Sequence, residues 1–406
     1  MWYKRQALPD AQRWIRLLRF RIPSLMEDID EIACDFELWA FDSAPAYTAL
    51  SYTWGHSTSY SPIGLGGCLD PVRPNCQYGL QQLRNHDSSA LYWINSICIN
   101  QQDSHEKSEQ VQIMGQVFRG ARRVMTSLSR PDRHCKLVIE TVQALQTTGQ
   151  INSDYCSSND DKAVLWLEKL LIETQRRVTE AYTSMCSNPY WRRVWIIQEL
   201  FLAREKFLVC GDLLLEWNQW VKLGETLERS FNVAAPEQSR RCRTLGSSGS
   251  SLYEKERKQS LDLADPESSD LHQEDPQLAV HTYLSPFYLV YSIMWSSGPT
   301  MNQVLGPLSL LECSDPEDHI YVFLGIIERR GFSPIRPDYN RGSLGLASEC
   351  LRCLSAVWHD GSVIMLWEKC GSLLDLLNID YELPGTFAIL GNQEGRERTG
   401  RYNSVA

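Results

Sequence analysis

Residues 47–55 read Tyr47-Thr48-Ala49-Leu50-Ser51-Tyr52-Thr53-Trp54-Gly55, and this run sets the class of fold. Its side chains favour a β-strand, and the glycine at its end is typical of a strand that stops at a loop. A central strand of this kind has Ser51 and Tyr52 near its carboxyl end. Open α/β sheets bind ligands at the carboxyl ends of their strands, so both residues are candidate ligand contacts. Simple packing within the strand is the alternative.

Strand-like and helix-like segments alternate after this run. Residues 91–99 predict a strand, residues 104–121 predict a helix with Ser104 as its N-cap, and residues 123–128 predict the next strand. Residues 206–211 predict a further short strand that a glycine closes. This alternation predicts an α/β fold with a parallel sheet flanked by helices on both faces.

Residues 192–200 read Arg192-Arg193-Val194-Trp195-Ile196-Ile197-Gln198-Glu199-Leu200 and predict a buried helix. Trp191, Trp195 and Leu202 lie at helical spacing, and Pro189 suits the first turn of such a helix.

Glu199 lies four residues after Trp195 and therefore on the same apolar face. A carboxylate on an apolar face is costly unless it is paired or exposed in a cleft, so Glu199 is a candidate site residue. The alternatives are a salt bridge to Arg192 or Arg193, or a place on the helix rim.

The composition excludes several classes of protein. The 406 residues carry a formal charge of -10, which argues against a general nucleic-acid binder. The 13 cysteines are scattered, and Cys350-Leu351-Arg352-Cys353 has no second pair, so no metal site is predicted. The N-terminus lacks the apolar run of a signal peptide, and residues 283–295 are too short and too polar to span a bilayer. A cytoplasmic protein with reduced thiols and no membrane span is expected.

Shifts in composition divide the chain into five expected parts. N-terminal strands at residues 1–46 lead into a core domain at 47–211, and a helical extension follows at 212–234. Residues 57–74, within the core, predict a loop with at most one short strand because they are rich in Ser, Gly and Pro. Residues 235–277 are polar and of low complexity, which predicts a disordered linker or insertion. Residues 278–406 predict a mainly helical region with a frayed tail.

Four ordered stretches resemble the fungal heterokaryon-incompatibility (HET) domain. The first is residues 47–55, and the second runs from Trp93 to Gln101 with Glu106, Gln110 and Met114 beyond it. The third is residues 193–199 with Cys210-Gly211, and the fourth, looser one is residues 315–325 with Pro337-Asp338-Tyr339. Four motifs in order are far more specific than any one of them. The chain departs from the family at Asn95, where the family has Asp, and at residues 126–129.

HET domains are distantly similar to TIR domains, and this resemblance implies a flavodoxin-like sheet. Trp195-x-x-x-Glu199 is similar to the motif of TIR domains that cleave NAD, in which the glutamate is the required residue. The resemblance therefore implies Glu199 as a catalytic residue, with NAD as a substrate and no bound cofactor. A carboxylate near the ribose would stabilise the positive charge that develops on the sugar as nicotinamide leaves.

Residues that would contact NAD are drawn from the same motifs: Ser51, Tyr52, Trp54, Gly55, Asn100, Gln101 and Trp195. Each has a structural alternative. The tryptophans suit core or rim packing, and Asn100-Gln101 suits a turn closed by its own backbone.

The resemblance implies a protein of incompatibility or innate-immunity-type signalling whose HET domain triggers programmed cell death. Self-association is the expected mode of activation, and an incompatibility or NLR-like protein is an expected partner. A non-enzymatic module that only self-associates or docks a partner is the competing hypothesis, because a shared fold does not establish an activity. A cleft at Glu199 would favour the enzyme, and a buried arginine beside Glu199 would favour the module.

Overall fold

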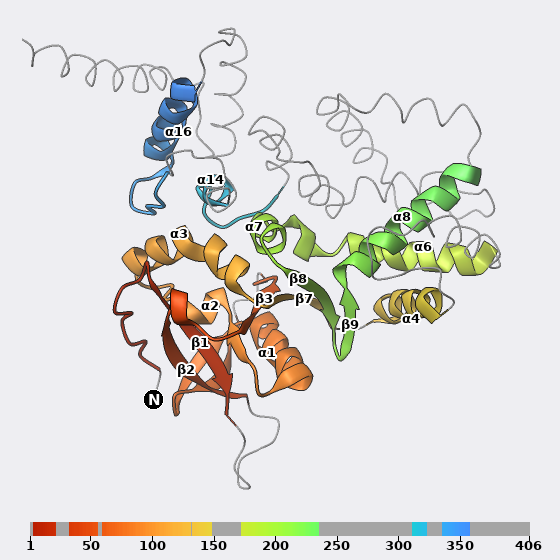
Figure 1. The fold of residues 1–406 in the computed structure, drawn as a ribbon, viewed down its shortest axis with the longest axis horizontal. Coiled ribbons are helices and arrows are strands. Elements are labelled where there is room, and N and C mark those ends of the chain that lie inside the picture. Colours follow the sequence, from red (N-terminus) through yellow and green to blue (C-terminus); the bar gives the residue numbers. More distant parts are fainter. Residues whose placement is uncertain are drawn as a thin grey trace, which may run out of the picture.

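A computed structural model describes residues 3–21, 32–55, 59–130, 132–147, 172–234, 311–322 and 335–357. The strands in these residues form one sheet in the order β5-β4-β2-β1-β6-β3-β7-β8-β9 (Figure 1). The expected linker at 235–277, and most of the expected helical region at 278–406, lie outside the described residues.

The centre of the sheet is parallel, as the sequence predicts. It consists of β6 (Leu91–Trp93), β3 (Tyr47–Tyr52), β7 (Arg123–Ser129) and β8 (Glu205–Cys210), each parallel to its neighbour. All six residues of β3 are buried, which fits its central place. The strand predicted at 91–99 is shorter than expected, because the chain leaves the sheet after Trp93 and forms the short helix α2 (Asn95–Cys98).

The sheet as a whole is mixed, because antiparallel strands extend the predicted parallel part at both edges. The N-terminal strands β1 (Trp14–Phe20) and β2 (Ala33–Ala40) pair antiparallel with each other, and β1 also pairs antiparallel with β6. At the other edge, β9 (Leu213–Glu216) pairs antiparallel with β8. Only two residues separate β8 from β9, and so short a connection can join only antiparallel strands. The extension expected to be helical from residue 212 therefore begins with a strand.

A β-hairpin occupies most of the stretch that was expected to be a loop. Strands β4 (Ser61–Leu65) and β5 (Cys68–Val72) pair antiparallel, and β4 runs parallel to β2. Gly66 and Gly67 join them with φ angles of 56° and 77°. Two-residue hairpin turns with positive φ at both positions favour glycine, so the residues that suggested a loop are those that make the turn.

Helices cover the sheet in two groups. Helix α1 (Pro74–Asp87) packs beside β3 and β7, and α3 (Ser104–Gly120) contacts α7 (Ile196–Phe201). Asp103, rather than Ser104, caps α3, because its carboxylate accepts from the backbone N–H groups of His105 and Glu106.

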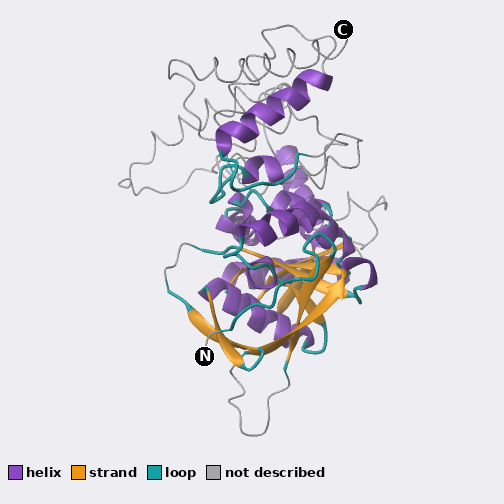
Figure 2. Ribbon diagram, turned by 90° about the vertical axis from the view of Figure 1, so that its left-hand side faces the viewer, coloured by secondary structure: helices purple, strands orange, loops and turns teal. Residues whose placement is uncertain are grey.

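The second group of helices lies at the β9 edge of the sheet (Figure 1). It consists of α4 (Arg133–Thr147), α6 (Ile172–Cys186) and α8 (Trp217–Ala234), of which α4 and α8 contact β9. Figure 2 shows α16 (Ser343–Val357) at the end of the molecule farthest from the strands.

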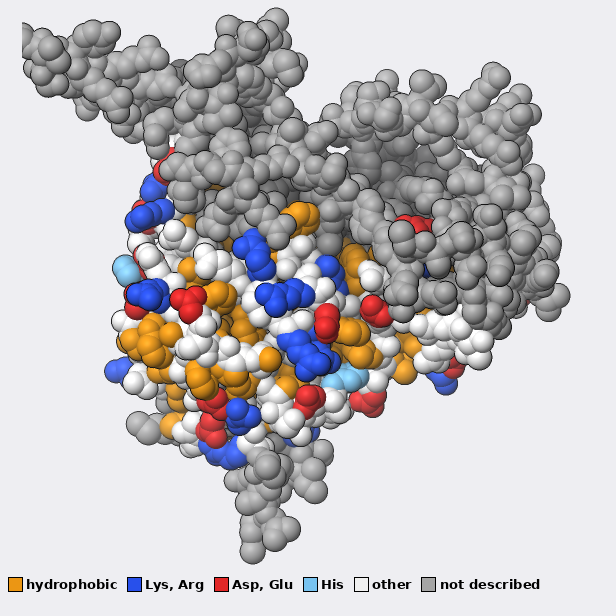
Figure 3. All heavy atoms as spheres, viewed as in Figure 1, with side chains coloured by type: hydrophobic (Ala, Val, Ile, Leu, Met, Phe, Trp, Pro, Cys, Tyr) orange, Lys and Arg blue, Asp and Glu red, His pale blue; other side chains and the backbone are white. Residues whose placement is uncertain are grey.

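Basic and acidic side chains are interspersed over the face seen in Figure 3. Within the described ranges, no helix is both long and apolar enough to cross a membrane.

Candidate functional site

Ser51 and Glu199 meet at the carboxyl end of β3. The Ser51 hydroxyl donates a hydrogen bond to Glu199 Oε2, although 148 residues separate the two in sequence. Both side chains are 1% exposed. The first and third motifs of the sequence therefore converge in space.

The helix expected to carry Glu199 is broken. Pro189–Arg192 form the 3-10 helix η2, Arg193 and Val194 are not helical, and α7 begins only at Ile196. The break has a long-range cause, since Glu312 pairs with the backbone on both sides of Arg193. A pattern read along residues 189–202 cannot include the isolated bridge from Arg193 to Glu312, which lies 119 residues further along the chain.

Arg193 forms an ion pair with the Glu199 carboxylate. Its Nη2 lies 2.9 Å from Oε1 and its Nη1 lies 3.1 Å from Oε2, so the pair is bidentate. Burial alone would lower the pKa of Arg193, but the adjacent carboxylate outweighs burial and the pKa is raised. The salt-bridge alternative for Glu199 is thus present in the structure. Arg192 instead points to the surface, 3.7 Å from Glu312 Oε1.

Tyr190 and Thr126 complete this network, and the sequence analysis missed both. The Tyr190 hydroxyl lies 2.6 Å from Ser51 Oγ and 3.4 Å from Thr126 Oγ1. Burial raises the pKa of Tyr190, so its phenol stays neutral near pH 7. Thr126 pairs in register with Ser51 on the adjacent parallel strand, a placement that only the structure shows.

Tyr52 and Trp54 belong to a second, neighbouring set of contacts. Side chains alternate along a strand, so Tyr52 points away from Ser51 and donates to Ser96 Oγ at 2.6 Å. Trp54 Nε1 donates to Asn95 Oδ1 at 3.3 Å, and Gly55 has a φ of 75° that suits glycine. Asn95 Oδ1 also accepts from the backbone N–H of Ser96. The residue that replaces the family's Asp therefore still acts as an acceptor at the start of α2.

Asn100 and Gln101 fold back on their own turn. Asn100 Oδ1 accepts from Gln102 N–H at 3.3 Å, and Gln101 Nε2 donates to the Asn95 carbonyl at 3.0 Å. The Asn100 N–H donates to Glu106 Oε1 at 2.7 Å. These contacts match the turn alternative and leave no contact to Glu199.

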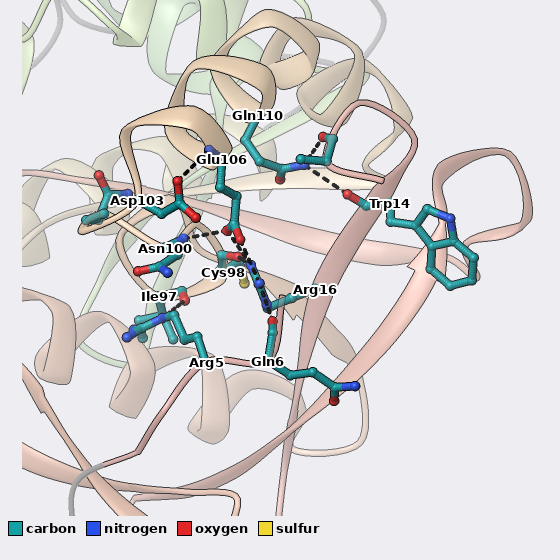
Figure 4. Close-up of polar contacts among 12 residues, drawn as sticks. Arg5, Gln6, Trp14, Arg16, Ile97, Cys98, Asn100, Asp103, Glu106 and Gln110 are labelled. Carbon is teal, nitrogen blue, oxygen red and sulfur yellow. Dashed lines mark hydrogen bonds and ion pairs between the residues drawn. The ribbon is translucent and has the colours of Figure 1, made fainter. Parts of the chain in front are cut away.

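A buried ion pair lies behind this turn (Figure 4). Arg16, 1% exposed, places Nη1 2.6 Å from Glu106 Oε1 and Nη2 2.9 Å from Glu106 Oε2. Arg16 Nη1 also donates to the Cys98 carbonyl at 2.9 Å. The pair thus joins β1, α2 and α3, which fixes the loop between α2 and α3.

Residues 47–199 match the family described as Heterokaryon incompatibility protein (HET). This segment is a HET domain. The match begins at the first residue of β3 and ends at Glu199, so it includes both halves of the Ser51–Glu199 contact. Strands β1, β2, β8 and β9 lie outside the matched residues, although they belong to the same sheet.

The chain is also similar to "Heterokaryon incompatibility protein 6, OR allele" of Neurospora crassa. The two are 29% identical over 241 residues, which cover 52% of this chain and 35% of that protein. The match therefore spans about a third of the length of the curated relative. No solved structure matches the chain.

Trp195, a predicted NAD contact, has its indole N–H hydrogen-bonded to a carboxylate outside the matched segment. Its Nε1 donates to Asp318 Oδ2 at 2.9 Å, and Tyr339 donates to Asp318 Oδ1 at 2.7 Å. Trp195 is half-buried and packs against all three apolar clusters of the described structure. No group of three or more metal-ligating side chains occurs among the residues that the structure describes.

Proposed function

We propose that this chain acts in heterokaryon incompatibility and that its HET domain is a cytoplasmic signalling module that triggers cell death. The family match and the Neurospora relative support an incompatibility-related role. Activation would follow self-association or contact with an incompatibility or NLR-like partner.

The observation that favours a module over an enzyme is the bidentate pair between Arg193 and Glu199. Both oxygens of the Glu199 carboxylate accept hydrogen bonds: Oε1 accepts from Arg193, and Oε2 accepts from Arg193 and from Ser51. A carboxylate that is 1% exposed and has a donor on each oxygen is not accessible to the hydroxyls of a ribose in this conformation. In this conformation Glu199 organises the domain.

NAD glycohydrolysis is the second candidate, and the place of Glu199 favours it. The carboxylate lies at the carboxyl end of β3, where α/β sheets bind ligands, and a movement of Arg193 would free it. In that reaction, water attacks the ribose carbon as nicotinamide leaves as a neutral base, and ADP-ribose and a proton are released. Glu199 would stabilise the oxocarbenium-like sugar, with the residues of the first and third motifs around the substrate.

Incubation of the purified full chain with NAD distinguishes the two candidates. The protein is compared in dilute form and after forced clustering, because self-association is the proposed trigger. Glu199→Gln keeps size and hydrogen bonding but removes the charge that the transition state needs. Glu140→Gln is the matched control, since Glu140 is exposed on α4.

The signalling module predicts no NAD consumption in any sample. Consumption by the clustered wild type and by Glu140→Gln, but not by Glu199→Gln, would overturn the module in favour of the glycohydrolase.

A further inference from the structure

Residues around Glu312 are docked on the loop that carries Arg193. The Val194 N–H donates to the Glu312 carbonyl at 3.0 Å, and the Glu312 N–H donates to the Arg192 carbonyl at 2.5 Å. These two bonds bracket Arg193 and hold it in an isolated parallel bridge. We call residues 311–322 and 335–340 the clamp.

A second contact joins the clamp to the HET domain through Trp195. Asp318, 6% exposed, accepts from Trp195 Nε1 and from the Tyr339 hydroxyl. Ile320 and Tyr321 of the clamp bury against Val111 of α3 in one small apolar cluster. The clamp therefore closes over the same short stretch that contains Arg193.

A third contact attaches the clamp to α3. Lys107 Nζ lies 2.7 Å from Asp315 Oδ2 and 3.8 Å from the centre of the Tyr339 ring. Figure 1 shows residues 311–322 beside α7, between the sheet and α16. The clamp thus bridges α3 and α7 without joining the large sheet.

The break between η2 and α7 is where local sequence and long-range contact disagree. The apolar spacing of residues 189–202 favours one continuous helix, whereas the two bonds to Glu312 hold Arg193 and Val194 out of it. In a continuous helix, residues six apart lie about 120° apart around the axis and about 9 Å apart along it. Arg193 and Glu199 could not keep their bidentate pair in that geometry.

We propose that the clamp is an intramolecular latch: while it is docked it keeps Arg193 on Glu199, and when it undocks residues 190–201 become one helix and the carboxylate is freed. Leu311 and Val322 of the clamp pack into the cluster around α4, α6 and α8, so undocking uncovers apolar surface there. Among the described residues, no strand of the sheet pairs with the clamp, so the clamp can open without unfolding the sheet. The idea that exposure of Glu199 triggers signalling rests on the proposed function. The undocking of the clamp and the formation of one helix over residues 190–201 do not depend on that function.

Hydrogen exchange of the full chain tests the latch. Glu312→Pro removes the N–H that donates to Arg192, whereas Glu312→Ala keeps that N–H and changes only an exposed side chain. We expect Glu312→Pro to speed exchange of the hydrogen-bonded amides at 318–322 by about tenfold or more because the clamp undocks, while β3 and β7 keep the wild-type rate. The expected far-UV circular dichroism gains helical signal, and Glu312→Ala matches the wild type in both measurements.

Asp318→Ala is the second variant. It tests the latch if Glu312→Pro also speeds hydrogen exchange in β3 and so disturbs the whole fold. It removes the acceptor of Trp195 and Tyr339 but leaves the backbone of the clamp intact. Faster exchange within 311–322 without the gain in helical circular dichroism signal would overturn the latch. An absence of NAD consumption would refute only the glycohydrolase, because these exchange measurements require no substrate.

Discussion

At the residue scale, the candidate site is one buried polar network. Ser51, Tyr190, Arg193 and Glu199 satisfy one another beneath the carboxyl end of β3. Removing one member of a buried ion pair leaves an uncompensated charge, which costs far more than the pair contributes when intact. The network is therefore sensitive to single substitutions, and its weak point is Arg193.

Arg193→Ala should lower the free energy of unfolding by about 3–5 kcal/mol, because it leaves the Glu199 carboxylate buried and unpaired. Arg192→Ala is the adjacent control. Its side chain is 53% exposed and 3.7 Å from its partner, so the change should stay within about 0.5 kcal/mol. Urea denaturation of the three proteins measures the difference. Equal midpoints for the two variants would contradict the buried pair.

At the scale of elements, sequence reasoning succeeds where structure is local. The strands at β3, β7 and β8 and the helix α3 follow from patterns within each segment. It fails where a residue distant in sequence determines the local backbone structure. The pattern at 189–202 predicts one helix, and Glu312 divides it.

The same limit applies to the candidate site. Ser51 and Glu199 were named from the sequence, and the structure brings them together. Thr126 was missed because only the register of the parallel strands β3 and β7 places it beside Ser51. Tyr190 was missed because only the tertiary packing of η2 brings its hydroxyl to Ser51. Trp195 was named for its motif, yet its indole N–H points to Asp318, which no local pattern indicates.

The docking of the clamp should depend on pH through Asp318. Burial raises the pKa of Asp318 from 3.8 to about 6. The folded state then holds a proton that the unfolded state loses. The stabilisation of the folded state by this proton is present at low pH and disappears as the pH rises through 6. Lys107 and Asp315 also act on this carboxyl group: Asp315 raises the pKa of Asp318 and Lys107 lowers it. The Tyr339 phenol stays neutral because its pKa is raised.

Thermal unfolding at pH 5 and at pH 7.5 measures this contribution. Asp318→Asn, which resembles the protonated form, is the reference. Relative to that variant, the wild type should gain on the order of 1 kcal/mol at the lower pH. The same difference between the two proteins at both pH values would rule out Asp318 as the titrating group.

At the scale of the whole molecule, Trp195 is the point where the parts of the chain meet. It packs against the cluster around α4, α6 and α8, the cluster around the central sheet, and the small cluster of the clamp. The matched HET segment ends four residues later, whereas the structure continues into β8, β9 and the clamp. The folded unit is therefore larger than the matched domain.

Trp195→Ala should loosen all three parts together. A large buried aromatic replaced by alanine costs roughly 3–5 kcal/mol, and the half-exposed place of Trp195 puts the expected loss at the lower end of that range. Trp195→Phe keeps most of the packing and removes only the donor to Asp318, so it should cost less. Melting temperatures rank the variants. An unchanged melting temperature for Trp195→Ala would mean that the ring does not join the clusters.

Cell viability on expression of the clustered chain tests the central claim most directly, namely that the Glu199 network is what the HET domain uses to trigger death. The account predicts that the wild type and Glu140→Gln reduce viability, while Glu199→Gln, expressed at the same level and folded by circular dichroism, does not. Equal killing by Glu199→Gln would contradict the account.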